Sequence, residues 1–233
     1  MSFSRAFLPQ KFPQGDELTS LLIGIGIRLN GRAKRNGNIE DLLVSSSLEG
    51  LAGDGRLLSL LIDWLEVHSA RINADRLVKV IITLKSEQDE RFIVFWAAIA
   101  QWLANDIRFA KLRKLAPKTR FDFLEDRTDF LIQKHGEDVR FQKTCLRVPD
   151  KVFRHRLDDI LSPEELAKIH TTYRFRILLG PSYRADMWAK LSQNPELSNA
   201  ELARICYGSY PTAFAVKKDF FILVGKMPEL KIA

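Results

Sequence analysis

The sequence predicts an all-α fold, in which an N-terminal helical bundle domain is followed by a small C-terminal group of helices. Three observations lead to this prediction. Apolar residues recur at steps of three and four along most of the chain, no segment sustains the period-two alternation of a half-buried strand, and capping residues precede several apolar runs. With 233 residues, 46% of them hydrophobic and 28% charged, the chain is long enough for one large domain or a large and a small one.

The first 116 residues are expected to form an irregular arm followed by a helical domain. The arm, residues 1–16, contains two prolines and a glycine without periodicity, and the helical domain spans 17–116. Apolar spacing predicts helices at 18–29, 39–51, 56–67, 73–84 and 90–103, and Asn73 is the expected N-cap of the fourth. Gly24 and Gly26 lack the third glycine of a dinucleotide-binding loop, so we interpret them as helix-packing positions.

Residues 117–180 are expected to form a basic helical connector. Short helices are predicted near 126–134 and 139–146, and Ser162, Pro163 and Glu165 supply the signals that open a further helix toward His170. The whole chain has a net charge of +7, and this excess lies between 108 and 156, where 14 Lys and Arg face 7 Asp and Glu, since the remaining residues carry 22 of each.

Local positive charge of this kind suits a surface that contacts phosphates, because neutralising phosphates releases condensed counterions. Lys111, Arg113 and Lys114 are the residues of this segment that we assign to such contacts. The alternative is a solvated helical surface without a nucleic-acid partner, and charge alone does not separate the two.

The last segment, 181–233, contains three consecutive helical patterns. The first, 184–193, places Met187, Trp188 and Leu191 on one side and ends at an Asn-Pro pair. The second begins at Ser198 with Glu201 three residues later, which is a capping box, and the small side chain of Ala203 permits close approach of a crossing helix. A turn at 207–209 then leads to a third helix capped by Ser209, with a proline in its first turn.

The third helix has two faces in the predicted pattern. Ala213, Val216, Phe220 and Leu223 recur at steps of three and four, so they are expected to pack on the preceding helices. The open face is expected to carry aromatic and basic side chains, namely Tyr210, Phe214, Lys217, Lys218 and Phe221. On a helix that enters the major groove, lysines contact guanine edges or phosphates and aromatic rings contact thymine methyl groups.

This arrangement over 184–223 resembles the helix-turn-helix of bacterial winged-helix regulators. The resemblance implies binding of double-stranded DNA through the third helix, with Ser209, Tyr210, Thr212, Phe214, Lys217 and Lys218 as contact residues. The sequence departs from the usual pattern in that Tyr207 stands where glycine is common, with Gly208 one residue later. Only ten residues follow Leu223, so a wing hairpin is expected to be short or absent.

Other chemistry finds little support in the sequence. Cys145 and Cys206 lie far apart without the spacing of zinc sites or redox pairs, and the four histidines are scattered, so no metal or disulfide is expected. Acidic groups at 122–126 and 158–159 are interpreted as solvated charges. No phosphate-binding loop, signal peptide or membrane-spanning stretch is present, so neither a cofactor nor an enzymatic activity is expected, and a cytoplasmic location fits best.

The leading hypothesis is a DNA-binding regulatory protein, either a transcriptional regulator or an antitoxin-like protein. In it the N-terminal helical domain senses a signal or dimerises, the basic region touches phosphates and the helix-turn-helix reads bases. The alternative is a helical protein-interaction module or complex-assembly subunit whose C-terminal helices dock on a protein partner. The partners expected are therefore double-stranded DNA and, in addition, a second copy of the chain or another protein.

Overall fold

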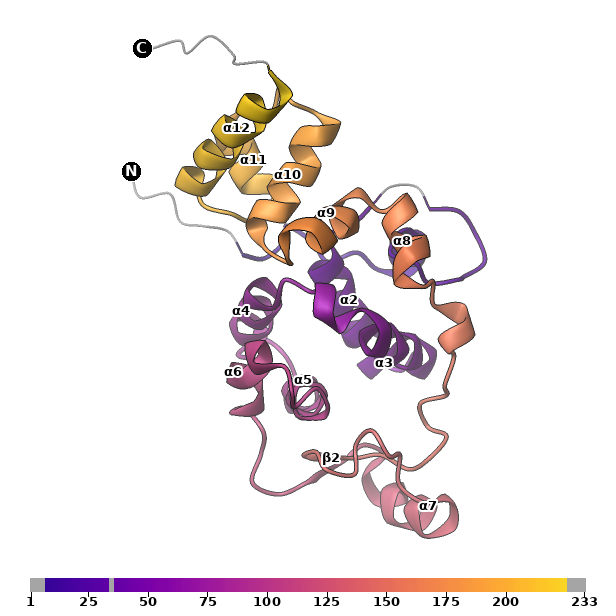
Figure 1. Ribbon diagram of the computed structural model, residues 1–233. Helices are drawn as coiled ribbons and strands as arrows, with labels where there is room; N and C mark the ends of the chain where they lie inside the picture. Colours follow the sequence, from indigo (N-terminus) through magenta and orange to yellow (C-terminus); the bar gives the residue numbers. More distant parts are fainter. Residues whose placement is uncertain (1–6, 34–35, 226–233) are drawn as a thin grey trace. The chain divides into compact units, whose positions relative to one another are not determined.

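The computed structural model describes residues 7–33 and 36–225, and these residues are mostly helical, as the sequence predicts (Figure 1). Strand structure in the described residues is confined to a parallel pair of two-residue strands, β1 (Phe121–Asp122) and β2 (Leu146–Arg147), and two isolated bridges. None of the helices in this part of the chain has both the length and the apolarity needed to cross a bilayer.

The chain forms two compact units. The N-terminal unit is Gln10–Ser162, and the C-terminal unit comprises residues 163–225 together with residues 7–9. The segment 117–180, expected as a separate connector, is therefore divided, because residues 117–162 belong to the first unit and residues 163–180 to the second.

The N-terminal unit is built on five longer helices and two short ones: α1 (Gly15–Gly24), α2 (Ile39–Leu51), α3 (Gly55–His68), α4 (Ala74–Leu84), α5 (Glu90–Trp102), α6 (Ala110–Arg113) and α7 (Thr128–His135). Capping explains several starts, since the side chains of Asn38, Asp54 and Asn73 accept hydrogen bonds from first-turn amides of α2, α3 and α4. Asn73 is thus the N-cap that the sequence predicts.

The core of the N-terminal unit lies among α2, α3, α4 and α5. Trp64 and Trp96 are fully buried there, and each indole has a hydrogen-bond acceptor. Trp64 donates to the carbonyl of Ile25 at 2.8 Å, and Trp96 donates to the hydroxyl of Ser47 at 3.1 Å. The two large rings are therefore buried without an unsatisfied N–H group.

The first predicted helix, 18–29, is wrong at both ends. Helix α1 begins at Gly15, within the expected arm, where the Gly15 amide donates to Glu49, and it ends at Gly24. Gly26 then takes a φ of +91°, which ends helical geometry, and Ile27 forms an isolated bridge with Ile160. Gly26 is thus a turn residue and not the helix-packing position expected.

The helix predicted at 139–146 is also wrong, because this segment forms turns and leads into β2. Its carbonyl groups are bound by a distant side chain: the guanidinium of Arg120 donates to the carbonyls of Phe141, Thr144 and Leu146. A residue outside the segment thus supplies hydrogen-bond donors to carbonyls that the turns leave open, among them the Phe141 carbonyl that a helix would have paired internally.

The C-terminal unit contains five helices in its described residues: α8 (Pro163–Ile169), α9 (Thr171–Leu179), α10 (Tyr183–Gln193), α11 (Asn199–Ile205) and α12 (Tyr210–Val224). Helix α8 starts at Pro163 as expected, but the separate helix α9 is absent from the predicted pattern. Its N-cap is His170, whose Nδ1 accepts from the Tyr173 amide at 3.1 Å. Arg176 of α9 forms a buried two-bond ion pair with Asp186 of α10.

Candidate nucleic-acid interface

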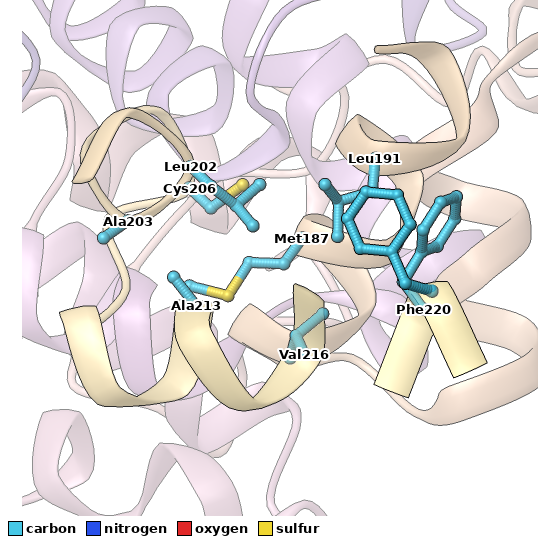
Figure 2. Close-up of a cluster of buried hydrophobic side chains, with 9 residues drawn as sticks. Met187, Leu191, Leu202, Ala203, Cys206, Ala213, Val216 and Phe220 are labelled. Carbon is cyan, nitrogen blue, oxygen red and sulfur yellow. The ribbon is translucent and has the colours of Figure 1, made fainter. Parts of the chain in front are cut away.

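Helices α10, α11 and α12 pack around one apolar cluster (Figure 2). The predicted inward residues of α10 and α11 are all there: Met187 and Leu191 are fully buried, and Trp188 packs against the cluster as a partly buried ring. From α11 and the position after it the cluster receives three residues, Leu202, Ala203 and Cys206. The sequence therefore predicted correctly which side of these two helices faces inward.

The turn between α11 and α12 depends on two special positions. Tyr207 has a φ of +54°, in the left-handed region that favours glycine, and it is the position at which the sequence departs from the usual glycine. Gly208 has a different role: a Cβ atom there would lie 2.1 Å from the Cε of Met187. Gly208 thus lets the turn approach the buried Met187 side chain, which would have to shift to admit a Cβ atom, whereas the left-handed position of the bend is Tyr207.

Helix α12 starts as the sequence predicts. The Ser209 hydroxyl accepts from the Thr212 amide at 3.2 Å and lies 2.7 Å from the Thr212 hydroxyl, and Pro211 occupies the first turn. Ser209 and Thr212, two expected DNA contacts, therefore hydrogen-bond to each other and are half-buried.

The faces of α12 differ from the expected ones at two positions. Ala213, Val216 and Phe220 are buried as expected, but Leu223 is 75% exposed and Phe221, expected on the open face, is only 7% exposed. The Phe221 ring packs edge-on against Phe220 at a centroid distance of 5.8 Å. These contacts rotate the buried stripe toward Phe221 near the end of the helix, and this rotation leaves Leu223 outside.

The two lysines of α12 have different surroundings. Lys217 is half-buried: its Nζ donates to the carbonyl of Leu197 at 2.6 Å and lies 5.6 Å from the centre of the Phe221 ring. Lys218 is exposed. Asp219 forms an ion pair with Arg184 at 3.1 Å, so the acidic group on this helix is itself partly neutralised. Lys218 is therefore the lysine on α12 whose charge is open to a partner.

The exposed stripe of α12, which we define as Tyr210, Phe214 and Lys218, is spaced at steps of four. Residues four apart lie on one side of a helix and are separated by about 6 Å along its axis. Tyr210 is 56% and Phe214 49% exposed, whereas Ala213 and Val216 are fully buried. The structure thus places the two aromatic candidates and one lysine together on an open face.

The expected phosphate contacts of the basic segment lie in the N-terminal unit, on α6 and directly after it. Lys111 and Lys114 are exposed. Arg113 is not comparably open, because its guanidinium donates to the carbonyls of Ala100 and Asp106 at 3.4 and 3.0 Å. Of the three candidates, the two lysines have charges available to a ligand, and the arginine joins α6 to α5.

Other arginines of the basic segment are also used within the fold. Arg140 is buried and binds both oxygens of Asp138 as well as one oxygen of Asp63. Arg147 binds Asp122 and Asp129. Much of the local positive charge seen in the sequence therefore stabilises the N-terminal unit, and the charge left for phosphates comes mainly from lysines.

One group of possible metal ligands was not foreseen from the sequence. Asp63, Glu66 and His155 bring ligand atoms within 4.8 Å of one another among the described residues. Both Asp63 oxygens already accept hydrogen bonds, from Arg140 and from the Arg156 amide, and the guanidinium would repel a cation. Burial raises the pKa of Asp63 more than these partners lower it. The arrangement therefore fits a structural ion pair better than a metal centre.

His68 and the two cysteines are buried within the fold. His68 is buried beside Trp64 and within hydrogen-bond distance of the Leu161 carbonyl, and burial lowers its pKa to about 4. Burial raises the pKa of Cys145 to about 11 and that of Cys206 to about 12, so both thiols stay protonated at neutral pH.

Comparison with known proteins gives no further guide, since no protein-family model, curated protein or solved structure matches the chain. The expected wing belongs to residues 226–233 and lies outside the described residues. The candidate interface therefore rests on the geometry of α10, α11 and α12.

Proposed function

We propose that this chain is a DNA-binding regulatory protein whose C-terminal unit places α12 in the major groove of duplex DNA. The observation that carries the proposal is the division of α12 into two sides. Ala213, Val216 and Phe220 fix it on α10 and α11, while the exposed stripe faces outward from the same helix. A recognition helix needs both properties, a rigid support and an open face that reaches base edges.

Charge supports the same proposal. Lys218 is the last residue of the exposed stripe, and its side chain is exposed. Lys111 and Lys114 are exposed lysines of the N-terminal unit. Contacts of this type position a protein on DNA without reading sequence, and each released counterion makes binding weaker at higher salt.

The salt dependence of DNA binding tests the proposal. Binding to a random-sequence duplex of about 24 base pairs is measured by fluorescence anisotropy between about 50 and 200 mM salt, where each phosphate contact adds about 0.9 to the slope. Lys218→Ala is expected to reduce the slope by about one contact. Lys168→Ala, which removes an exposed lysine of α8 in the same unit, is the matched control and should change it less.

The two exposed lysines at 111 and 114 are tested in the same salt titration. Lys111→Ala combined with Lys114→Ala is expected to lower the slope by about two contacts and to weaken binding equally for all sequences. Absence of duplex binding by the wild-type chain at the lowest salt overturns the proposal. A slope that is equally sensitive to Lys168 and Lys218 places the DNA away from α12.

A second candidate function is a protein-interaction module that docks through the end of α12. The observation that favours it is a run of three exposed apolar residues, Ile222, Leu223 and Val224, directly after the buried stripe. Exposed apolar clusters of this kind mark contact surfaces. If Leu223→Asp abolishes association with a protein and leaves the salt slope on DNA unchanged, this second function is supported.

A further inference from the structure

The chemistry of the exposed stripe restricts what α12 can recognise in a DNA groove. The helix contains no Arg, Asn or Gln between Tyr210 and Val224, so lysine is the one side chain on it that can bind a purine edge through hydrogen bonds to two base atoms. The exposed lysine, Lys218, lies in the C-terminal half of the helix. The exposed side chains in the N-terminal half are Tyr210, Pro211 and Phe214, and two of these three are aromatic. Residues near the start of a recognition helix are the ones that contact base edges.

We infer that α12 reads the C5 methyl groups of thymines in the major groove, through apolar contact with the rings of Tyr210 and Phe214. This inference rests on the proposed function and specifies its substrate. The thymine methyl is the apolar group that a base pair presents in the major groove, so it is the feature to which these two side chains are complementary. Lys218, one step further along the stripe, supplies a phosphate contact.

The spacing of the stripe agrees with this assignment. Four residues of α-helix advance by about 6 Å, and two base steps of B-DNA advance by about 6.8 Å. With α12 along the groove, Tyr210 and Phe214 therefore reach methyl groups about two base steps apart. The helix that carries both rings is fixed in place, because Ala213 and Val216 lie in the core cluster.

Four duplexes of about 24 base pairs test the inference by changing methyl groups alone. An alternating A·T duplex is compared with the same duplex in which uracil replaces thymine, and an alternating G·C duplex with one that carries 5-methylcytosine. Each pair has the same charge and base pairing. Burial of one methyl group corresponds to about fourfold in affinity, so loss of two is expected to weaken binding about fifteenfold, and methylation of cytosine is expected to strengthen it.

Variants identify the residues responsible. Tyr210→Ala combined with Phe214→Ala is expected to abolish the difference between thymine and uracil duplexes, whereas Lys218→Ala weakens binding to both equally. Ile222→Ala removes an exposed apolar side chain from the far end of the same helix and is the matched control. Because Tyr210 and Phe214 are exposed, their loss is expected to leave the melting temperature nearly unchanged.

The result that overturns the inference is distinct from failure of DNA binding. Equal affinity for thymine and uracil duplexes, with normal salt dependence, leaves DNA binding in place and shows that methyl groups are not read. A thymine preference that persists in the Tyr210 and Phe214 double variant also overturns it, because other side chains must then make the contact. Absence of any duplex binding overturns the proposed function itself.

Discussion

The N-terminal unit and the apolar cluster of α10, α11 and α12 in the C-terminal unit differ in how they use charged side chains. In the N-terminal unit, two arginines form buried ion pairs: Arg76 is fully buried against Asp41, and Arg140 is buried between Asp138 and Asp63. The cluster that joins α10, α11 and α12 is wholly apolar, and Lys218 and Arg204 remain at the surface of these helices. The buried ion pair of the C-terminal unit, Arg176 with Asp186, joins α9 to α10 outside this cluster.

This difference shows that positive charge in a sequence is not equivalent to positive charge on a surface. The segment with the largest excess of Lys and Arg holds most of its guanidinium groups against carbonyls and carboxylates, while α12 has few charges and one of them, Lys218, is exposed. Arginine is suited to the first role because its planar fork binds several acceptors at once. The comparison yields three predictions about stability.

The largest effect is expected from Arg140→Met. Removal of this guanidinium leaves the buried carboxylates of Asp63 and Asp138 without their main positive partner, which typically costs about 3–5 kcal/mol. Urea unfolding of the N-terminal unit, followed by tryptophan fluorescence in a Trp188→Phe background, measures the change. Arg154→Met alters an exposed arginine nearby and is expected to cost less than about 0.5 kcal/mol. Similar losses for both variants contradict the buried-network interpretation.

An effect of intermediate size is expected from acid. Burial lowers the pKa of His68 from 6.5 to about 4. Between these two pH values the imidazole is therefore mostly neutral in the folded state and mostly protonated in the unfolded state. The resulting stability is present above pH 6.5 and is lost as pH falls from 6.5 toward 4, by about 3 kcal/mol in total.

Urea unfolding at pH 7 and pH 4.5 checks this dependence on His68. In His68→Gln the fall in stability between the two pH values is expected to shrink, whereas His135→Gln, at an exposed position on α7, should behave as wild type. An unchanged pH dependence in His68→Gln assigns the acid sensitivity to other groups, among which the carboxylates are the first candidates.

The smallest effect is expected in the apolar core of the C-terminal unit. Gly208→Ala places a methyl group 2.1 Å from the Cε of Met187, and overpacking of this type typically costs about 1–3 kcal/mol. Hydrogen exchange of the α11 and α12 amides measures the loss. Met187→Leu removes the clashing atom, so the double variant is expected to be more stable than the sum of the two single changes predicts. Strict additivity excludes the Met187 contact as the cause.

Local signals explain which parts of this fold were predictable. Helices α2, α11 and α12 are capped by Asn38, Ser198 and Ser209, whose side chains accept hydrogen bonds from first-turn amides. Capping residues of this type can be recognised in a sequence. Helix α9 begins at His170, which caps through a ring nitrogen and carries no such signal. The turns that replace the expected helix at 139–146 accept hydrogen bonds from Arg120, a residue about twenty positions earlier. A local apolar pattern does not reveal such a distant partner.

The candidate site was predictable to a similar degree. Steps of three and four correctly placed Ala213, Val216 and Phe220 inside and Tyr210 and Phe214 outside. The same spacing does not distinguish Phe221 from Leu223 near the end of α12, where contacts of Phe221 with Phe220 and Lys217 decide the orientation. The hydrogen bond from Lys217 to the Leu197 carbonyl could not be predicted from the sequence either, because it joins a loop and a helix that are twenty residues apart.

The two cysteines give each unit a reporter of its own motion. Cys145 lies in the N-terminal unit and Cys206 in the C-terminal unit, and both are buried thiols with raised pKa values. A thiol-reactive probe can modify such a group only while the surrounding structure is open, so the labelling rate records how often each unit opens. Mass spectrometry of the peptides that contain each cysteine then measures the opening rate of each unit separately within one intact chain, without any engineered label.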